Sequence, residues 1–224
     1  MKQSPVILAL DVPERARTLE LAKLLGPEVG MVKLGLESFV AHGPDLVRAV
    51  VGMGLPVFLD LKLHDIPRTA AAAAKMALDL KVKLLTVHAS GGAEMVRACR
   101  EAVGDALHLV AVTVLTSLGD DDLAGVGFSG QAATVAARLG KLAIDSGAHG
   151  LVCSALDLPA LAGIGGTRVV PGVRAAAGAI HDQKRVATPA QAMKAGATWL
   201  VVGRPILEAS DPVAAARAIN AELG

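Results

Sequence analysis

Aromatic side chains are scarce in this sequence: they make up 2% of its 224 residues, and tyrosine is absent. Charge of one sign is also lacking, because 22 Lys and Arg stand against 21 Asp and Glu and leave a net charge of +1. Nucleic-acid binding depends largely on a basic surface or on aromatic stacking, so we expect no nucleic-acid partner. Any anionic ligand must be held by a local site.

Long apolar runs are missing too, although hydrophobic residues make up 53% of the chain. Charged residues or glycine interrupt each run well before the roughly 20 apolar residues that a membrane span requires. The short run from Val6 to Leu10 ends at Asp11 without the cleavage site of an export signal. These absences predict a cytoplasmic protein without a membrane partner.

Cysteine is limited to Cys99 and Cys153, which fall in a predicted helix and a predicted buried strand. Small core residues are a better interpretation than disulfide partners, metal ligands or nucleophiles. The six histidines are scattered and form no metal-binding pattern, so the sequence predicts no metal site. We interpret His64 and His88 as structural residues.

Short apolar and β-branched runs alternate with amphipathic or alanine-rich stretches along the whole chain. They predict strands near 6–11, 30–34, 56–62, 83–88, 107–114, 149–153, 167–171 and 198–203. Helices are expected near 14–25, 43–53, 67–79, 91–103, 130–147, 154–163, 188–195 and 212–222, with Gly26, Gly104, Gly147 and Gly196 as C-caps. Eight such units predict a single (β/α)8 TIM barrel over residues 1–224. An open doubly wound sheet is the alternative, although no glycine fingerprint follows the first strand.

Two connections exceed the usual length of roughly two to six residues, namely 116–130 and 173–187. In a barrel both follow strands, the fifth and the seventh. Both therefore lie on the carboxyl-terminal face, where barrel enzymes build their sites. We expect 173–187 to be a lid that closes over a bound phosphate.

Charged residues gather where the predicted strands end. Burying an ion costs several kcal/mol unless it is paired, so a core strand has no structural use for both Asp60 and Lys62. Side chains two apart on a strand share a face, so both should project into the barrel mouth. Asp65 follows on the loop, and Lys33 is placed to reach the same spot. We interpret the four as an alternating array that leaves a lysine aimed at substrate; a structural salt-bridge network is the alternative.

A second cluster combines Pro171-Gly172-Val173-Arg174 with Gly203-Arg204, at the ends of the seventh and eighth predicted strands. Barrels commonly bind phosphate there, through backbone N–H groups near glycine and a basic side chain. The plainer interpretation is a tight turn at Gly203 and a solvated charge at Arg204.

The run Asp60-Leu61-Lys62-Leu63-His64-Asp65-Ile66-Pro67, followed by Thr69, resembles the signature of the orotidine 5'-monophosphate decarboxylases. Further matches stand in the order that the family shows: Leu10-Asp11, Val32-Lys33, Leu115-Thr116-Ser117, Pro171 to Arg174, Asp182-Gln183 and Gly203-Arg204-Pro205. The resemblance implies cofactor-free decarboxylation of orotidine 5'-monophosphate to uridine 5'-monophosphate in pyrimidine biosynthesis.

The resemblance also implies roles for single residues. Lys62 would donate a proton to C6 of the pyrimidine, with Asp60 and Asp65 as electrostatic partners. Lys33 and Asp11 would hold the ribose, Thr116 or Ser117 the pyrimidine, and Gln183 would bridge base and phosphate. The phosphate would be bound by Pro171, Arg174, Gly203 and Arg204. The family forms homodimers with shared active sites, so Asp65 and Thr69, next to the substrate-binding Ile66, would serve the partner's site.

Two alternatives remain open at this point. Related sugar-phosphate lyases share an Asp-x-Lys-x-x-Asp core but use a divalent cation, and Ile66, Thr69 and Gln183 favour the pyrimidine nucleotide over them. A non-catalytic nucleotide-binding barrel is the other alternative, and the retention of both aspartates and both lysines argues against it.

Overall fold

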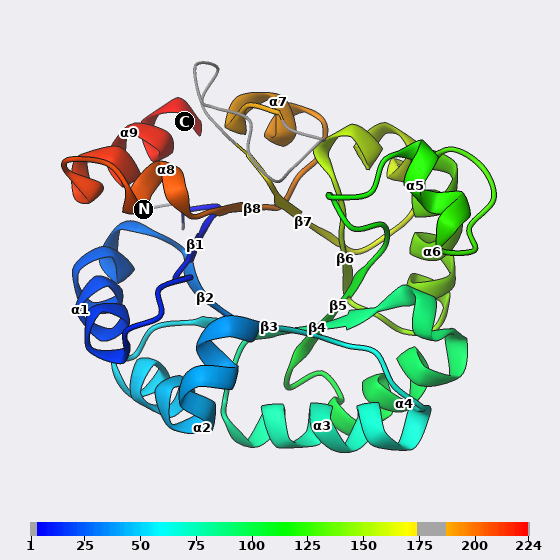
Figure 1. Ribbon diagram of the computed structural model, residues 1–224, viewed down its shortest axis with the longest axis horizontal. Helices are drawn as coiled ribbons and strands as arrows, with labels where there is room; N and C mark the ends of the chain where they lie inside the picture. Colours follow the sequence, from blue (N-terminus) through cyan, green and yellow to red (C-terminus); the bar gives the residue numbers. More distant parts are fainter. Residues whose placement is uncertain (1–3, 174–186, 224) are drawn as a thin grey trace.

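Eight parallel strands form a closed barrel in the computed structural model, which describes residues 4–173 and 187–223 (Figure 1). The strands are β1 (Val6–Ala9), β2 (Met31–Gly35), β3 (Val57–Leu63), β4 (Leu84–His88), β5 (His108–Val112), β6 (Gly150–Val152), β7 (Thr167–Pro171) and β8 (Trp199–Val202). β1 pairs with both β2 and β8. The predicted (β/α)8 barrel is therefore confirmed, and the open sheet is excluded.

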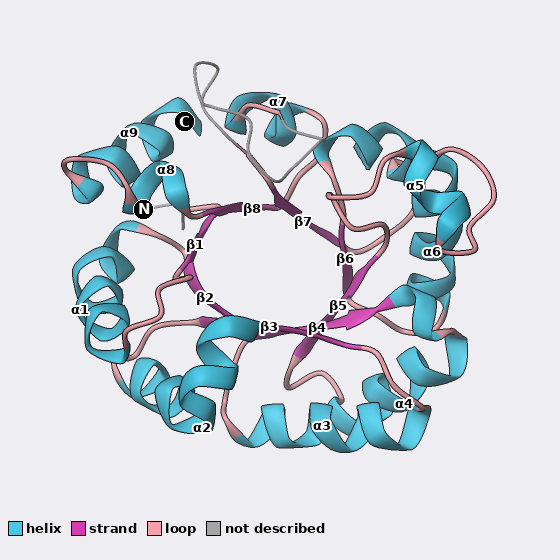
Figure 2. Cartoon of the chain, in the orientation of Figure 1, coloured by secondary structure: helices cyan, strands magenta, loops and turns pink. Residues whose placement is uncertain are grey.

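Helices surround the ring of strands (Figure 2). They are α1 (Arg15–Leu25), α2 (Leu36–Gly52), α3 (Pro67–Asp79), α4 (Ala93–Val103), α5 (Asp120–Gly125), α6 (Ala132–Asp145), α7 (Pro189–Lys194), α8 (Arg204–Leu207) and α9 (Pro212–Leu223). Short 3-10 helices are η1 (Gly26–Glu28), η2 (Ala89–Gly91) and η3 (Ala155–Leu161). None of the helices in the described ranges combines the length and the apolar character that crossing a bilayer requires.

Several predicted helices need correction. The helix expected at 43–53 begins already at Leu36 and kinks at Gly43, whose φ of 61° interrupts it before Pro44. The stretch 154–163 forms the 3-10 helix η3, and the long connection 116–130 contains α5. The short helix α8 was not predicted. Gly26 does not cap α1 in a left-handed conformation: its φ is −52°, and the chain continues directly into η1.

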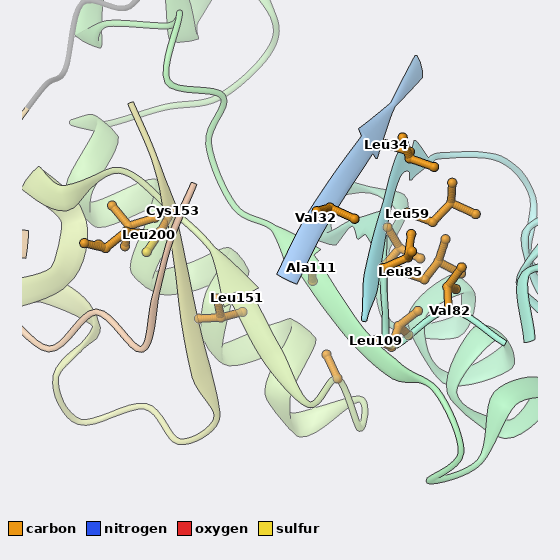
Figure 3. Packing of buried hydrophobic residues seen from close by; sticks show 14 of the residues in the cluster. Val32, Leu34, Leu59, Val82, Leu85, Leu109, Ala111, Leu151, Cys153 and Leu200 are labelled. Carbon is orange, nitrogen blue, oxygen red and sulfur yellow. The ribbon is translucent and has the colours of Figure 1, made fainter. Parts of the chain in front are cut away.

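Strand alternation divides the apolar side chains into two layers. The outward residues pack under the helices, and Figure 3 labels members such as Leu59, Leu85 and Leu109 on neighbouring strands. The inward residues form a separate cluster inside the barrel that includes Met31, Phe58, Leu84, Val110, Val169 and Val201. Trp199 is partly buried and packs against this inner cluster. The inner cluster forms an apolar layer on the same inward face from which the charged side chains project.

The end of β3 departs from regular pairing. Leu59 pairs with Leu85 and Leu63 with Val87, so β3 advances from 59 to 63 while β4 advances from 85 to 87. Lys62 lies in this bulge with a φ of 51°, in the left-handed region that residues with a Cβ rarely adopt. Bulges of this kind re-aim side chains, and here the re-aimed residue is a lysine that lines the barrel mouth.

Candidate active site

A cavity of about 510 Å³ opens at the carboxyl-terminal ends of the strands. It lies within the range of about 300–1,000 Å³ that is typical of small-molecule sites. The charged and polar side chains among its lining residues are Asp11, Lys33, Asp60, Lys62, Thr116, Arg204 and Glu208. Sequence reasoning identified all of these except Glu208, which follows Arg204 by one helical turn.

The floor of the cavity carries a chain of alternating charges. Lys33 Nζ lies 2.9 Å from Asp11 Oδ1 and 3.8 Å from Asp60 Oδ2. Lys62 Nζ donates a hydrogen bond to the same Asp60 Oδ2 at 2.8 Å. Lys33 and Asp60 are 7% and 9% exposed, so their charges are compensated mainly by each other and by their neighbours. The array predicted from the sequence is present, but Asp11 and not Asp65 is the second carboxylate within the chain.

Gly35, at the end of β2, makes room for this ion pair and was not singled out in the sequence. A Cβ at this position would lie 3.0 Å from both Asp11 Oδ1 and Lys33 Nζ. Its φ of −96° is accessible to any residue, so only crowding restricts the position.

Thr86, in the middle of β4, is a second residue that sequence reasoning missed. Its side chain is completely buried and contacts both Asp60 and Lys62. The hydroxyl donates to Asp60 Oδ1 at 2.9 Å and accepts a hydrogen bond from the Lys62 backbone N–H at 2.8 Å. A threonine inside an apolar strand gives no local signal of such a contact, because its partners lie on another strand.

The ends of β7 and β8 also line the cavity. Pro171, Gly172 and Val173 do so at the end of β7, and Gly203 and Arg204 do so after β8. Gly172 has a φ of 77°, which favours glycine, and a Cβ at Gly203 would lie 3.3 Å from the Ala9 Cβ. The two glycines therefore let the backbone turn and approach the cavity closely.

Other predicted site residues lie away from this cavity. Within the described part of the chain, its lining does not include Asp65, Ile66, Thr69 or Ser117, all of which are exposed. The Asp65 carboxylate accepts a hydrogen bond from the Ile66 N–H at 2.7 Å. Of the two adjacent candidates for the pyrimidine contact, only Thr116 faces the cavity. Arg174, Gln183 and most of the predicted lid 173–187 lie outside the described residues.

His88 ends β4 close to the charged chain. Burial, above all, together with the nearby His64 and Lys62, lowers the pKa of His88 to about 4, although Asp60 acts in the opposite direction. Its ring centroid lies 5.2 Å from that of His64. At neutral pH His88 is therefore uncharged, and the cationic groups at this edge of the barrel are the lysines. In the described ranges no group of three or more His, Cys, Asp or Glu side chains is arranged to hold a metal ion.

Comparison with known proteins gives a consistent result. Residues 4–219 match the family model described as the orotidine 5'-phosphate decarboxylase / HUMPS family. The chain is 51% identical over 221 residues to a curated orotidine 5'-phosphate decarboxylase of Anaeromyxobacter sp. (strain K), covering 97% of each chain. It is 47% identical to the enzyme of that name from Pseudomonas aeruginosa (strain LESB58), covering 99% of this chain and 98% of the relative. A crystal structure of orotidine 5'-phosphate decarboxylase from Lactobacillus acidophilus superposes with a TM-score of 0.86 at 37% identity, covering 99% of this chain and all of that one.

Proposed function

The chain belongs to the orotidine 5'-phosphate decarboxylase / HUMPS family, and we propose that the residues of its cavity carry out a decarboxylation in the following way. It decarboxylates orotidine 5'-monophosphate to uridine 5'-monophosphate, a step of pyrimidine biosynthesis. Both curated relatives described above carry the decarboxylase name, which favours the decarboxylase over a metal-dependent sugar-phosphate lyase. The observation that carries the proposed mechanism is the alternating chain Asp11–Lys33–Asp60–Lys62 on the cavity floor.

The order of the strands suggests how the nucleotide lies in the cavity. Because the barrel is closed, the ends of β7 and β8 are followed by β1, β2 and β3. A phosphate bound by Arg204 and the backbone at Gly172 and Gly203 would then be next to Asp11 and Lys33, which would hold the ribose hydroxyls. The base would extend towards Lys62 and Thr116. The phosphate-binding, ribose-binding and base-binding residues are thus arranged in the order in which phosphate, ribose and base are joined in the nucleotide.

Lys62 is proposed as the group that acts on the reacting carbon. Breaking the bond between C6 and the carboxylate releases CO2 and leaves an electron pair on C6 with no obvious electron sink. An ammonium beside C6 stabilises this negative charge and then donates its proton to C6, which yields uridine 5'-monophosphate. Lys62 is left neutral and regains a proton from solvent. Its side chain is 31% exposed, so it can reach both the substrate and water.

Asp60 is proposed to orient Lys62 and to disfavour the ground state. Its Oδ2 holds the Lys62 ammonium at 2.8 Å, which fixes the direction of the proton donor. A substrate carboxylate placed beside this buried carboxylate is repelled, whereas the transition state disperses that negative charge. In this arrangement Asp60 favours the transition state over the bound substrate.

We further propose a homodimer in which Asp65 and Thr69 of each chain complete the site of the other. Asp65 is exposed and absent from the lining of its own cavity, as expected of a residue used elsewhere. Ile66 and Met76 are 64% and 57% exposed, whereas Ala70, Ala74 and Ala77 of α3 are buried in the core of their own chain. The exposed apolar side chains near Asp65 are suited to a subunit interface.

We also propose that segment 173–187 acts as a lid and that the protein works in the cytoplasm. Segment 173–187 would close over the phosphate, with Arg174 on the phosphate and Gln183 between base and phosphate. Closure would exclude water and direct remote binding energy to the chemical step. A reducing cytoplasm suits two cysteines, Cys99 and Cys153, that are buried and not joined in a disulfide.

The Lys62→Ala variant tests the central role. We expect the fall in ultraviolet absorbance of orotidine 5'-monophosphate to slow by about 10⁴-fold or more, because one side chain supplies both charge stabilisation and the proton. Binding of uridine 5'-monophosphate, measured by calorimetry, should survive. Lys141→Ala is the matched control, since Lys141 forms an exposed ion pair with Asp145 on α6. Substantial residual turnover by Lys62→Ala would refute the assignment, as would loss of wild-type activity in EDTA.

Mixing two inactive variants tests the shared site. Lys62→Ala and Asp65→Ala chains, unfolded and refolded together in equal amounts, would form mixed dimers with one intact site each. Random pairing gives such dimers in half of the population, so about a quarter of wild-type activity should return. No recovery, or an active monomer in gel filtration, would show that each chain completes its own site.

A further inference from the structure

Thr86 is a buried polar residue that neither contacts the substrate nor transfers a proton in the proposed reaction. It has the same strand parity as Leu84, whose side chain belongs to the apolar cluster inside the barrel. Its side chain is 0% exposed, so it touches no solvent and reaches no substrate directly. A hydroxyl at such a position costs free energy unless both of its hydrogen-bonding functions are satisfied.

The hydrogen bonds of Thr86 have a single possible direction. The Lys62 backbone N–H can only donate, so the Thr86 oxygen accepts from it at 2.8 Å. The one hydroxyl proton is then available for Asp60 Oδ1, 2.9 Å away. An ionised carboxylate only accepts hydrogen bonds, so this arrangement fits the charged form of Asp60. One hydroxyl thus links the backbone of the lysine to the side chain of the aspartate.

The bulge in β3 explains why a side chain is needed here. Thr86 is the residue of β4 that lies between the pairs Leu59–Leu85 and Leu63–Val87, directly opposite the bulged segment. Lys62 adopts a φ of 51° there, a left-handed conformation that is unfavourable for a residue with a Cβ. It persists only if its surroundings hold it, and the Thr86 hydroxyl is the acceptor that the structure describes for its N–H.

The two oxygens of Asp60 are divided between two tasks. Oδ1 receives the Thr86 hydroxyl, while Oδ2 receives Lys62 Nζ at 2.8 Å and faces Lys33 Nζ at 3.8 Å. With Oδ1 held, rotation of the carboxylate is restricted and Oδ2 remains directed at the lysines. We propose that Thr86 is a positioning residue for the decarboxylation, which sets both the backbone of Lys62 and the orientation of Asp60. This inference rests on the roles proposed above for these two residues.

The experiment compares Thr86→Val with Thr86→Ser and with Thr113→Val. Valine has the shape of threonine but removes both hydrogen bonds, whereas serine keeps the hydroxyl. Thr113→Val is the matched control, because it removes a buried threonine hydroxyl away from the charged chain. Thr113 follows β5, is 3% exposed, and donates to the Val152 carbonyl at 3.2 Å. For Thr86→Val we expect kcat to fall by about 10- to 100-fold, the size typical of a lost hydrogen bond to a charged group. KM should change by less than about threefold, because no contact to the substrate is removed.

Serine should restore kcat to within about threefold of wild type, and Thr113→Val should retain wild-type kcat even if its melting temperature falls. Unchanged kcat in Thr86→Val, no rescue by serine, or an equal loss in Thr113→Val would overturn the proposal. If the valine variant does not fold, Thr86→Cys takes its place, since a thiol is a weak donor and acceptor, and a full kcat there counts equally against Thr86. The Lys62→Ala variant distinguishes the proposed function from the role of Thr86. Activity in Lys62→Ala refutes the catalytic role of Lys62. An inactive Lys62→Ala together with a fully active Thr86→Val refutes only the positioning role of Thr86.

Discussion

Two buried cations on separate strands of the barrel have opposite uses. Lys33 on β2 and Arg168 on β7 are 7% and 6% exposed, so burial does not distinguish them. Lys33 points into the barrel and faces the carboxylates of Asp11 and Asp60. The neighbours of Arg168 on β7, Val169 and Val170, belong to the inner and outer clusters in turn, so Arg168 has the parity of the outer layer.

The partners of Arg168 are backbone carbonyls. In the described part of the chain its guanidinium donates to Gly165 O at 2.8 Å, to Gly166 O at 2.9 Å and to Leu161 O at 3.0 Å, with further bonds to Ile164 O and Thr167 O. Burial lowers the pKa of this guanidinium. The side chain thereby fixes the connection from η3 to β7. A buried charge is thus a marker of chemistry only when it faces a cavity with groups that can act on a ligand.

Replacing each cation by methionine tests this contrast. Lys33→Met should give the larger loss of activity. We expect kcat/KM to fall by about 10³-fold, because the charged chain loses its central ammonium and the proposed ribose contact. The melting temperature should change little. Asp11 is 49% exposed in its side chain and can be hydrated, and Asp60 keeps both Lys62 and Thr86. Steady-state kinetics and thermal unfolding check both parts, and a large loss of stability with normal activity would reverse the interpretation.

Arg168→Met should show the opposite pattern. Several carbonyls lose their donor at once, so we expect the free energy of unfolding to fall by about 2–4 kcal/mol. For a domain of this size that corresponds to a melting temperature lower by roughly 5–15 °C. Activity measured well below the transition should remain within about twofold of wild type. The comparison fails if Arg168→Met lowers kcat as strongly as Lys33→Met does.

Gly35→Ala should give the smallest effect. The new methyl group would lie 3.0 Å from Asp11 Oδ1 and from Lys33 Nζ, so the ion pair must move by a few tenths of an ångström. We expect KM to rise by roughly two- to fivefold, with little change in the melting temperature, because the backbone conformation suits alanine. Gly52→Ala is the matched control, since a Cβ there meets nothing within 4 Å. Equal KM values for the two variants would show that the pair tolerates displacement.

The barrel was largely predictable because its pattern is local. Each strand is a short buried run, and the predicted strand 167–171 coincides with β7 while the others differ by one to three residues at their ends. The kink at Gly43 and the short helices α5 and α8 could not be placed in this way. Such elements are only one or two turns long, and their stability comes from packing against the rest of the fold.

The candidate site was predictable in its composition more than in its connections. Lys33, Asp60 and Lys62 were expected together and lie together. They were expected because a core strand has no structural use for two charges that point inward. Arg168 is a different case: it is a single charge with the parity of the outer layer, and it donates to carbonyls such as Gly165 O and Leu161 O. The local sequence around Arg168 does not indicate whether its guanidinium faces a cavity or a group of backbone carbonyls.

The eight strand and helix units and the set of charged groups at the strand ends follow from local sequence patterns. Three other features depend on the folded barrel: Lys33 pairs with Asp11, Thr86 donates to Asp60, and Asp65 lies outside the cavity of its own chain. They differ because polar contacts are short. Ion pairs and hydrogen bonds form within about 3–4 Å, and that separation depends on barrel closure and on the register of β3 against β4, which no single strand encodes.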